Sequence, residues 1–414
     1  MSARVAGAVL AIALIGLAAA GPRFAPGAEP GSPGWVLGAF GDGLGLAGWQ
    51  FLALLAVAFL GYLSVVVAAP GLSRRALWWG AAAAVALFAL APPLLSLDVF
   101  SYISYGRLEL EGLNPYAAAP ADLPGDDAGE RVRDYRDAES VYGPLFTLLS
   151  VPLAALGAPA ALWAFKALTA LAALALVALV GRLAARRGAS PQRAVAAVAL
   201  NPILLVHGVG GPHNDVLMTA GVVAAIALAW SSREALAGAA LAGAVAIKSV
   251  GGLAAPFALL GVGGSGGRGR RAAATRLVAG GIGAGIAIGA VGVALWGGDV
   301  ARTLDVLGTS QGRISHWSVP ATIARAGVDV DVVRAVLAAA FGVALIWLLR
   351  WTWRGGDWVR AAGWATFGLL VASAYLTPWY VVWLLPLAAL ARDRALLALT
   401  LALTAFQLRP TIPL

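Results

Sequence analysis

The chain has 414 residues, of which 60% belong to the apolar set and only 12% are charged, with a formal net charge of +9. Soluble chains carry about 25% charged residues, and a soluble fold this apolar would expose large hydrophobic patches to water. The composition therefore excludes an ordinary cytosolic enzyme, a disordered chain and a secreted domain, and predicts a polytopic membrane protein.

Cysteine and histidine usage limits the chemistry. The chain has no cysteine, which excludes disulfides, thiolate metal sites and Cys nucleophiles, and its three histidines argue against a His-rich metal cage. We expect no metal site built by the protein, although Mg²⁺ bridged mainly by a substrate phosphate would leave little trace in a sequence. The basic residues lie mostly at the ends of apolar segments, which indicates membrane topology rather than nucleic-acid binding.

Apolar segments recur along the whole chain. A bilayer core of about 30 Å needs about 20 apolar residues in a helix. We expect one all-α domain over residues 1–414 with about eleven to thirteen transmembrane helices plus re-entrant segments. The first segment resembles a signal peptide, and the sequence leaves open whether residues 1–20 are cleaved. The candidate spans are roughly 5–20, 47–69, 76–95, 160–181, 191–206, 216–230, 277–296, 332–350, 359–376, 380–391 and 395–409.

The basic residues assign the two sides of the membrane. Most of the 29 Lys and Arg residues gather in one set of connections, including the basic loop 263–276, and this side is expected to be cytoplasmic. For the spans to alternate, 143–157 must be re-entrant or interfacial, and 236–262 must be a broken helical pair. Lys248 and Ser249 would lie near its tip, with Gly251 and Gly252 as the break.

This topology places the chemically suggestive segments on one extracytoplasmic side. They are the first large outer loop 96–142, the segment 207–215, the Lys248 tip, the second outer loop 297–331 and the segment 376–383. Within the first loop, the charged stretch 121–139 is expected to be solvated, mobile and without a chemical role.

Asp98 stands where an apolar run meets an aromatic stretch. A carboxylate at that depth is costly unless it is paired or lines a wet cavity. Partial desolvation would raise its pKa and let it accept a proton from an alcohol. The alternative is a helix cap at the membrane boundary.

Four cationic side chains are candidates to bind a phosphate. Arg107 either pairs with Asp98, binds an anion or neutralises Glu109 or Glu111. Lys248 either meets a phosphate or snorkels to the head groups. Arg313 and His316 offer an anion-binding pair beside Trp317.

Histidines, amides and aromatic rings supply candidate substrate-binding groups. His213, Asn214 and Asp215 open a span after a Gly-rich turn, where they either cap the helix or help to hold a phosphate. Trp379 and Tyr380 either stack on a sugar or belong to an interfacial aromatic belt. The full candidate set is Tyr102, Tyr116, Tyr142, His207, His213, Asn214, Asp215, Trp317, Trp379 and Tyr380.

No nucleotide-binding motif, zinc-protease motif or nucleophile elbow is present. An outward-facing enzyme would therefore take an activated donor from the membrane. The segments SLDVFSYISYGRLELEGLNPY, ESVYGPLFTLLS, ALNPILLVHGVGGPHNDVLM, AIKSV and LTPWYVVWLLP resemble the polyprenol-phosphate-mannose-dependent α-1,6-mannosyltransferases of actinobacteria, which belong to the GT-C class.

The resemblance implies a multi-pass enzyme of the bacterial cytoplasmic membrane with an extracytoplasmic active site. It implies polyprenyl-phosphate-mannose as donor, a lipid-linked mannan as acceptor, an inverting α-1,6 transfer, and Asp98 as the essential acidic residue. Membrane lipids are the other expected partners. The alternatives are a secondary transporter or flippase of lipid-linked sugar, since broken helices also build transport sites, and an envelope scaffold protein.

Overall fold

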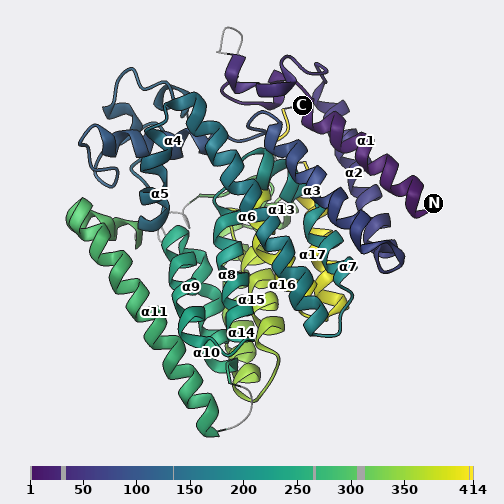
Figure 1. The fold of residues 1–414 in the computed structure, drawn as a ribbon, viewed down its shortest axis with the longest axis vertical. Helices are drawn as coiled ribbons and strands as arrows, with labels where there is room; N and C mark the ends of the chain where they lie inside the picture. The colour runs from purple at the N-terminus through teal and green to yellow at the C-terminus, as the bar shows by residue number, and fades with distance from the viewer. Residues whose placement is uncertain are drawn as a thin grey trace.

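The computed structural model describes residues 2–28, 34–133, 135–263, 267–304, 313–409 and 411–413. These residues form helices and connecting turns with no β-strand among them, so the expected all-α architecture is confirmed. Most helices lie side by side in one bundle (Figure 1). The α-helices before the first outer loop are α1 (Ala3–Ala18), α2 (Gly48–Ala68) and α3 (Arg74–Leu90).

The remaining helices follow in chain order. The first outer loop contributes α4 (Asp98–Leu110), and α5 (Pro144–Ala154) leads into α6 (Ala158–Arg186). A break then separates α7 (Pro191–Ala199) from a π-helix (Leu204–Gly210). The later helices are α8 (Asp215–Ala229), α9 (Glu234–Ile247), α10 (Ala255–Gly261), α11 (Gly267–Trp296), α13 (Val319–Ala324), α14 (Val330–Trp353), α15 (Trp358–Ala372), α16 (Val381–Leu390) and α17 (Arg394–Phe406).

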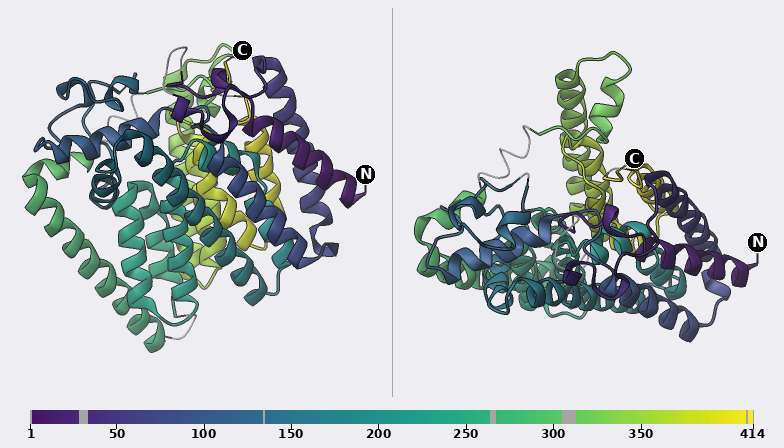
Figure 2. Two further views of the ribbon diagram at one scale, coloured as in Figure 1. Left: turned by 45° about the horizontal axis from the view of Figure 1, so that its top comes forward. Right: turned by 90° about the horizontal axis from the view of Figure 1, so that it is seen from above.

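Four of the described helices are long and apolar enough to cross a membrane, and five qualify if the bent pair of α7 and the π-helix is one span. Shorter apolar helices, among them α5, α8, α9 and α15, pack beside them. This supports a polytopic membrane protein, while the expected number of crossings stays a prediction. Figure 2 shows that α13 and the first part of α14 project from the side of the bundle.

Ion pairs join several of the connections that were assigned to the cytoplasmic side. Arg276 Nε lies 3.0 Å from Glu234 Oε2, which ties the start of α9 to α11. Arg360 Nε lies 2.7 Å from Asp393 Oδ2. Arg187 pairs with Asp357 and so joins the end of α6 to the start of α15. These contacts join connections that lie far apart in sequence, and the side of the membrane that they face stays a prediction.

The broken pair expected over 236–262 is confirmed in outline. Helix α9 ends at Ile247, and Lys248 takes an extended conformation before a 3₁₀ turn (Ser249–Ala254) leads into α10. The break therefore falls at Lys248 itself, not at Gly251 and Gly252, which lie inside the 3₁₀ turn. The lysine thereby stands half-buried at the end of a helix, and its side chain reaches across to Asp215 of α8.

A buried amide links three helices beneath the site. Asn201 Nδ2 donates to the Tyr62 hydroxyl at 3.2 Å and to Thr404 Oγ1 at 3.3 Å. The Tyr62 hydroxyl in turn donates to Ala197 O at 2.7 Å. Because a buried polar group is costly without partners, this network fixes α2, α7 and α17 relative to one another.

Candidate active site

Two helix starts bring opposite charges together. Asp98 is the first residue of α4 and Asp215 the first of α8. His213 Nδ1 lies 3.3 Å from Asp98 Oδ2 and 3.9 Å from Asp215 Oδ2. Lys248 Nζ lies 2.8 Å from Asp215 Oδ1, to which Trp383 Nε1 also donates at 2.5 Å. Helix N-termini favour carboxylates. We call Asp98, His213, Asp215 and Lys248 the Asp98 cluster.

The capping alternative does not account for Asp98 or Asn214. The N-cap position of α4 is Leu97, and the N-cap residue of α8, Asn214, makes no capping bond with its side chain. Both amide atoms of Asn214 and both ring nitrogens of His213 are buried without an aligned hydrogen-bond partner in the described part of the chain. Buried polar atoms are rarely left unpaired. His213 Nδ1 lies beside Asp98, and the side chains of His213 and Asn214 are buried behind the residues that line the cavity.

The expected rise in the pKa of Asp98 is wrong. Burial by itself would raise this pKa, but the hydrogen bond and charge of His213, the charge of Lys248 and the Ser96 hydroxyl together lower it below its ordinary value of 3.8. Asp98 is thus held as a carboxylate. The sequence could not indicate this sign, because His213 lies far along the chain and reaches Asp98 only in the fold.

Backbone contacts hold the cluster in position. Leu95 adopts a φ of 58°, which is unusual for a residue with a branched side chain, and strain of this kind gathers at functional sites. Its neighbour Leu94 donates to Gly210 O at 3.2 Å. The fully buried Lys166 donates to the same oxygen at 2.6 Å. This explains a lysine that sequence reasoning left without a role, because its amino group donates to carbonyls at the end of the π-helix that precedes His213.

Aromatic rings enclose the cluster on one side. Trp379 stacks on His213 with centroids 3.8 Å apart, and Tyr380 stacks on Trp383 at 4.2 Å. Lys248 Nζ stands 4.9 Å from the centre of the Tyr380 ring. Of the two roles predicted for Trp379 and Tyr380, the structure favours a place in the site over an interfacial belt alone.

A cavity of about 820 Å³ opens beside the cluster. Four cationic side chains line it: Arg23, Arg133, Lys248 and Arg313. Asp98 is the one carboxylate among its described lining residues. A cleft lined mainly by one sign of charge concentrates ligands of the opposite sign. The cavity is therefore suited to an anionic ligand whose reacting end meets a carboxylate.

The first outer loop forms one wall of this cavity, contrary to the solvated loop expected over 121–139. Arg133 and Tyr135 line the cavity, and the Tyr135 and Tyr375 hydroxyls are 3.0 Å apart. The Tyr105 hydroxyl donates to Ala138 O at 2.8 Å and so fixes this wall to α4. The guanidinium of Arg313 stands 4.8 Å from the centre of the Tyr135 ring.

Several predicted site residues lie elsewhere. Arg107 pairs with Glu111 at 2.9 Å, so its role as a counter-ion is the one that the structure favours. His316 is exposed, and its ring contacts Trp317, which is itself covered by Arg325. Neither Arg107, His316 nor Trp317 is among the described residues that line the cavity. Sharing one side of the membrane did not place them at one site.

Other candidates support the site from beneath. The Tyr102 hydroxyl accepts a hydrogen bond from the Asn214 backbone at 3.4 Å, and Tyr142 lines the cavity. Tyr116 is buried and donates to Thr147 Oγ1 at 2.8 Å, which makes it part of the loop's core. His207 was expected in a loop but lies buried in the π-helix, with its ring 6.1 Å from that of Trp379.

Sequence reasoning missed Arg23 and Arg133. Arg23 belongs to a 3₁₀ turn after α1, and Arg133 to the charged loop that was expected to have no chemistry. Their positions depend on how two loops pack against each other, which no local pattern encodes.

Fold and site together define the class as a helical membrane protein with a cation-lined cavity and one ionised carboxylate. The sequence model of the alpha-(1->6)-mannopyranosyltransferase family, N-terminal domain, matches residues 4–263 of the chain. The model of the MptB C-terminal domain matches residues 318–413. The chain belongs to this family.

Similarity to characterised relatives is local. The chain is 30% identical over 190 residues to Alpha-(1->6)-mannopyranosyltransferase A of Corynebacterium glutamicum. The matched region covers 45% of this chain and 38% of the relative. It is 28% identical over 229 residues to Alpha-(1->6)-mannopyranosyltransferase A of Mycobacterium tuberculosis, covering 53% and 43%. The matches thus span less than half of either relative. The comparison with solved structures gave no match.

Proposed function

We propose that this protein is an inverting mannosyltransferase that moves mannose from polyprenyl-phosphate-mannose to a lipid-linked mannan and forms an α-1,6 linkage. The observation that carries the proposal is the Asp98 carboxylate at a cavity whose other charged lining residues, among those described, are four cations. A sugar phosphate needs both elements, since the leaving group is anionic and the incoming alcohol must lose a proton. The names of the relatives support mannose and the 1,6 linkage.

The transfer step balances with Asp98 as the general base. The acceptor 6-hydroxyl attacks C1 of the donor mannose, and its proton passes to the Asp98 carboxylate. The C1–O bond to phosphate breaks, and the polyprenyl phosphate leaves with the electron pair. Attack from the face opposite the phosphate inverts the configuration at C1, so one base suffices. The lowered pKa keeps Asp98 ready to accept that proton.

The cations supply the other half of the catalysis. Lys248 and Arg313 line the cavity on the side of the Trp379 and Tyr375 segment, and Arg133 lines it from the first outer loop. Positive charge that is fixed before the reaction stabilises the phosphate as the C1–O bond breaks. Arg107 and His316 have no part in this proposal, because they do not line the cavity. We place this chemistry at the extracytoplasmic face, opposite the basic loops.

The test is a cell-free assay with purified protein in lipid nanodiscs, radiolabelled polyprenyl-phospho-mannose and a defined mannan acceptor. We expect an α-1,6-linked product, and Asp98→Asn should lower the rate by about 10²–10⁴-fold, the contribution of a general base. Glu111→Gln is the matched control, because it changes a carboxylate just after the end of the same helix that pairs with Arg107 away from the cavity.

Two results would overturn the proposal. Near-normal transfer by Asp98→Asn would remove the base. Movement of the labelled lipid across vesicles without any mannose–mannose bond would favour the rival flippase, to which the helix breaks at Lys248 and between α7 and the π-helix are also suited.

A further inference from the structure

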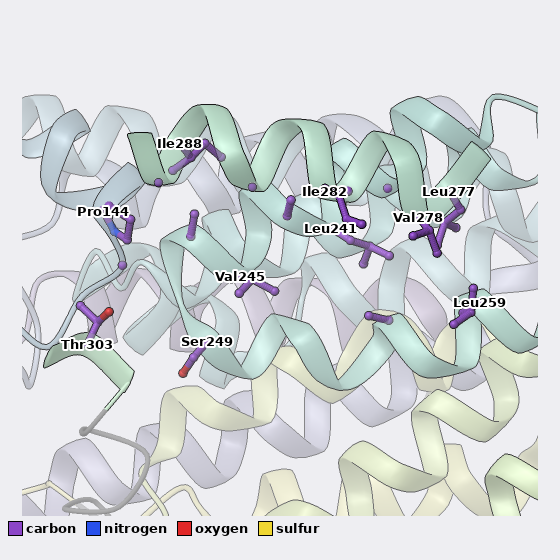
Figure 3. Close-up of a pocket in the computed structure, with 18 of the residues that line it drawn as sticks. Pro144, Leu241, Val245, Ser249, Leu259, Leu277, Val278, Ile282, Ile288 and Thr303 are labelled. Atoms are coloured by element: carbon purple, nitrogen blue, oxygen red, sulfur yellow. The ribbon is translucent and has the colours of Figure 1, made fainter. Parts of the chain in front are cut away.

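A second, apolar space lies between α9, α10 and α11. It has a volume of about 500 Å³, and Val141 and Ser249 line both this groove and the cation-lined cavity. Figure 3 shows Pro144, Ser249 and Thr303 at one end and Leu259, Leu277 and Val278 at the other. Ser249 and Thr303 are the lining residues, among those described, whose side chains carry a polar atom. The polar groups thus stand at one end, and the rest of the groove is hydrocarbon.

The way α9 and α11 pack explains the groove. A Cβ at Gly238 would collide with the backbone of Leu277, and one at Gly280 with the backbone of Ala235. The backbones of α9 and α11 are therefore in contact near Leu277 and Gly280. Toward its other end α11 leans away from α9 (Figure 1). The groove is the wedge that opens between them.

Glycines make the floor of the wedge deep. Gly281, Gly285 and Gly289 follow one another at intervals of four residues, which places them on one face of α11, and all three line the groove. A Cβ at Gly285 or Gly289 would have no atom within 4 Å. These positions are therefore not glycine for the sake of helix packing, since a side chain would fit without touching the protein. A side chain at Gly285 or Gly289 would instead fill part of the groove.

We propose that this groove binds the first few isoprene units of the lipid donor, with Gly285 and Gly289 keeping it open. The inference rests on the proposed function. A prenyl phosphate is an amphiphile with its charge at one end. The cavity offers cations for the charged end, and the adjoining groove offers apolar side chains for the hydrocarbon. The occupant is a chain attached to the reacting phosphate, because the groove adjoins the cavity at Ser249 and Val141.

The length of the groove sets how much of the chain it holds. From Leu277 to Gly289 a helix rises about 18 Å. An isoprene unit has four main-chain bonds of about 1.5 Å each and advances about 5 Å. The groove therefore contacts about three to four units. Any further units lie in the membrane, where they gain nothing from the protein because lipid is equally apolar.

The experiment measures kcat/KM with synthetic mannosyl phosphates that carry one, two, four or seven isoprene units. The purified full chain is compared with its Gly285→Leu variant, and Gly283→Leu is the matched control. Gly283 lies on the same helix with nothing within 4 Å of a Cβ, but it is not among the described groove residues. Thermal unfolding of each variant verifies that all three proteins are folded.

We expect Gly285→Leu to lower kcat/KM about tenfold or more for the four-unit donor, as overfilling a packed site does, and to leave the one-unit donor unchanged. The wild-type enzyme should gain nothing from four to seven units. Equal behaviour of Gly285→Leu and Gly283→Leu with the four-unit donor would overturn the groove and leave mannosyl transfer standing, with a bilayer lipid as the occupant. Absence of transfer from every donor by the wild type would instead overturn the proposed function, and the groove proposal with it.

Discussion

Replacing His213 by phenylalanine should raise the pKa of Asp98. The phenyl ring keeps the stack on Trp379 but removes the nitrogen that lies 3.3 Å from Asp98 Oδ2. Burial of Asp98, which raises its pKa, then acts against a smaller opposing effect. A hydrogen bond to a charged group contributes about 1.5–3 kcal/mol, and one pKa unit corresponds to about 1.4 kcal/mol. The pKa should therefore rise by about one to two units.

The assay is the rate of mannosyl transfer measured as a function of pH. A base must be ionised to accept a proton, so the rate falls as the pH drops through the pKa of Asp98. In the wild type this fall lies below the ordinary carboxyl value of 3.8, because the pKa is lowered. In His213→Phe it should lie about one to two units higher than in the wild type. His316→Gln is the control, since His316 is exposed and does not line the cavity.

The stability of the protein should follow the same sign. A carboxyl group whose pKa is lowered in the folded state stabilises the fold above its unfolded pKa, and this contribution is lost as the pH falls through the folded pKa. His213→Phe should thus be less stable than the wild type at neutral pH, with the difference shrinking in acid. If the transfer rate of His213→Phe fell at the same pH as that of the wild type, or at a lower pH, the reasoning that His213 keeps Asp98 ionised would be refuted.

Three further changes test separate features. Arg313→Gln removes a cavity-lining cation, so the KM for the donor should rise about tenfold. Arg107→Gln, away from the cavity, should leave this KM unchanged. Equal effects of the two substitutions would contradict the cavity as the donor site. Lys166→Met leaves the Gly210 carbonyl without its buried hydrogen-bond donor, so the protein should unfold several degrees lower, with partial recovery in Lys166→Arg. An unaltered thermal midpoint would show that this contact does not stabilise the fold. Asp393→Asn removes the ion pair with Arg360, and the protein should lose about 1 kcal/mol of stability at neutral pH. This loss should vanish in acid, because the pKa of Asp393 is lowered in the folded protein. Burial would raise this pKa, but hydrogen bonds from Trp364 and Leu396 and the charge and hydrogen bond of Arg360 lower it.

Much of the architecture follows from local patterns in the sequence. Apolar length predicted α2, α6 and α14, and the distribution of arginine predicted which connections share a side of the membrane. The broken pair over 236–262 also followed from pattern, because alternation of the loops required it to enter and return, but the break was expected at Gly251 and Gly252 and falls at Lys248. The π-helix did not, because its apolar residues are continuous with those of α7 and nothing in the periodicity marks a change of winding.

The site was predictable only in part. Asp98, Lys248 and the run from His213 to Asp215 were predicted candidates, and the fold brings them together. A predicted shared side of the membrane is nevertheless a weak constraint, since His316 was predicted to share it and lies outside the cavity. Arg133 shows the converse, because its loop looks solvated in sequence and becomes a cavity wall through long-range packing.

The most direct test of the account is a cryo-electron microscopy structure of the protein with a non-cleavable phosphonate analogue of polyprenyl-phosphate-mannose. The account predicts the phosphonate between Lys248 and Arg313, C1 of the mannose turned toward the Asp98 side of the cavity, and the first isoprene units between α9 and α11. A sugar bound away from Asp98, or a phosphonate held at the end where Arg276 and Glu234 pair, would contradict it.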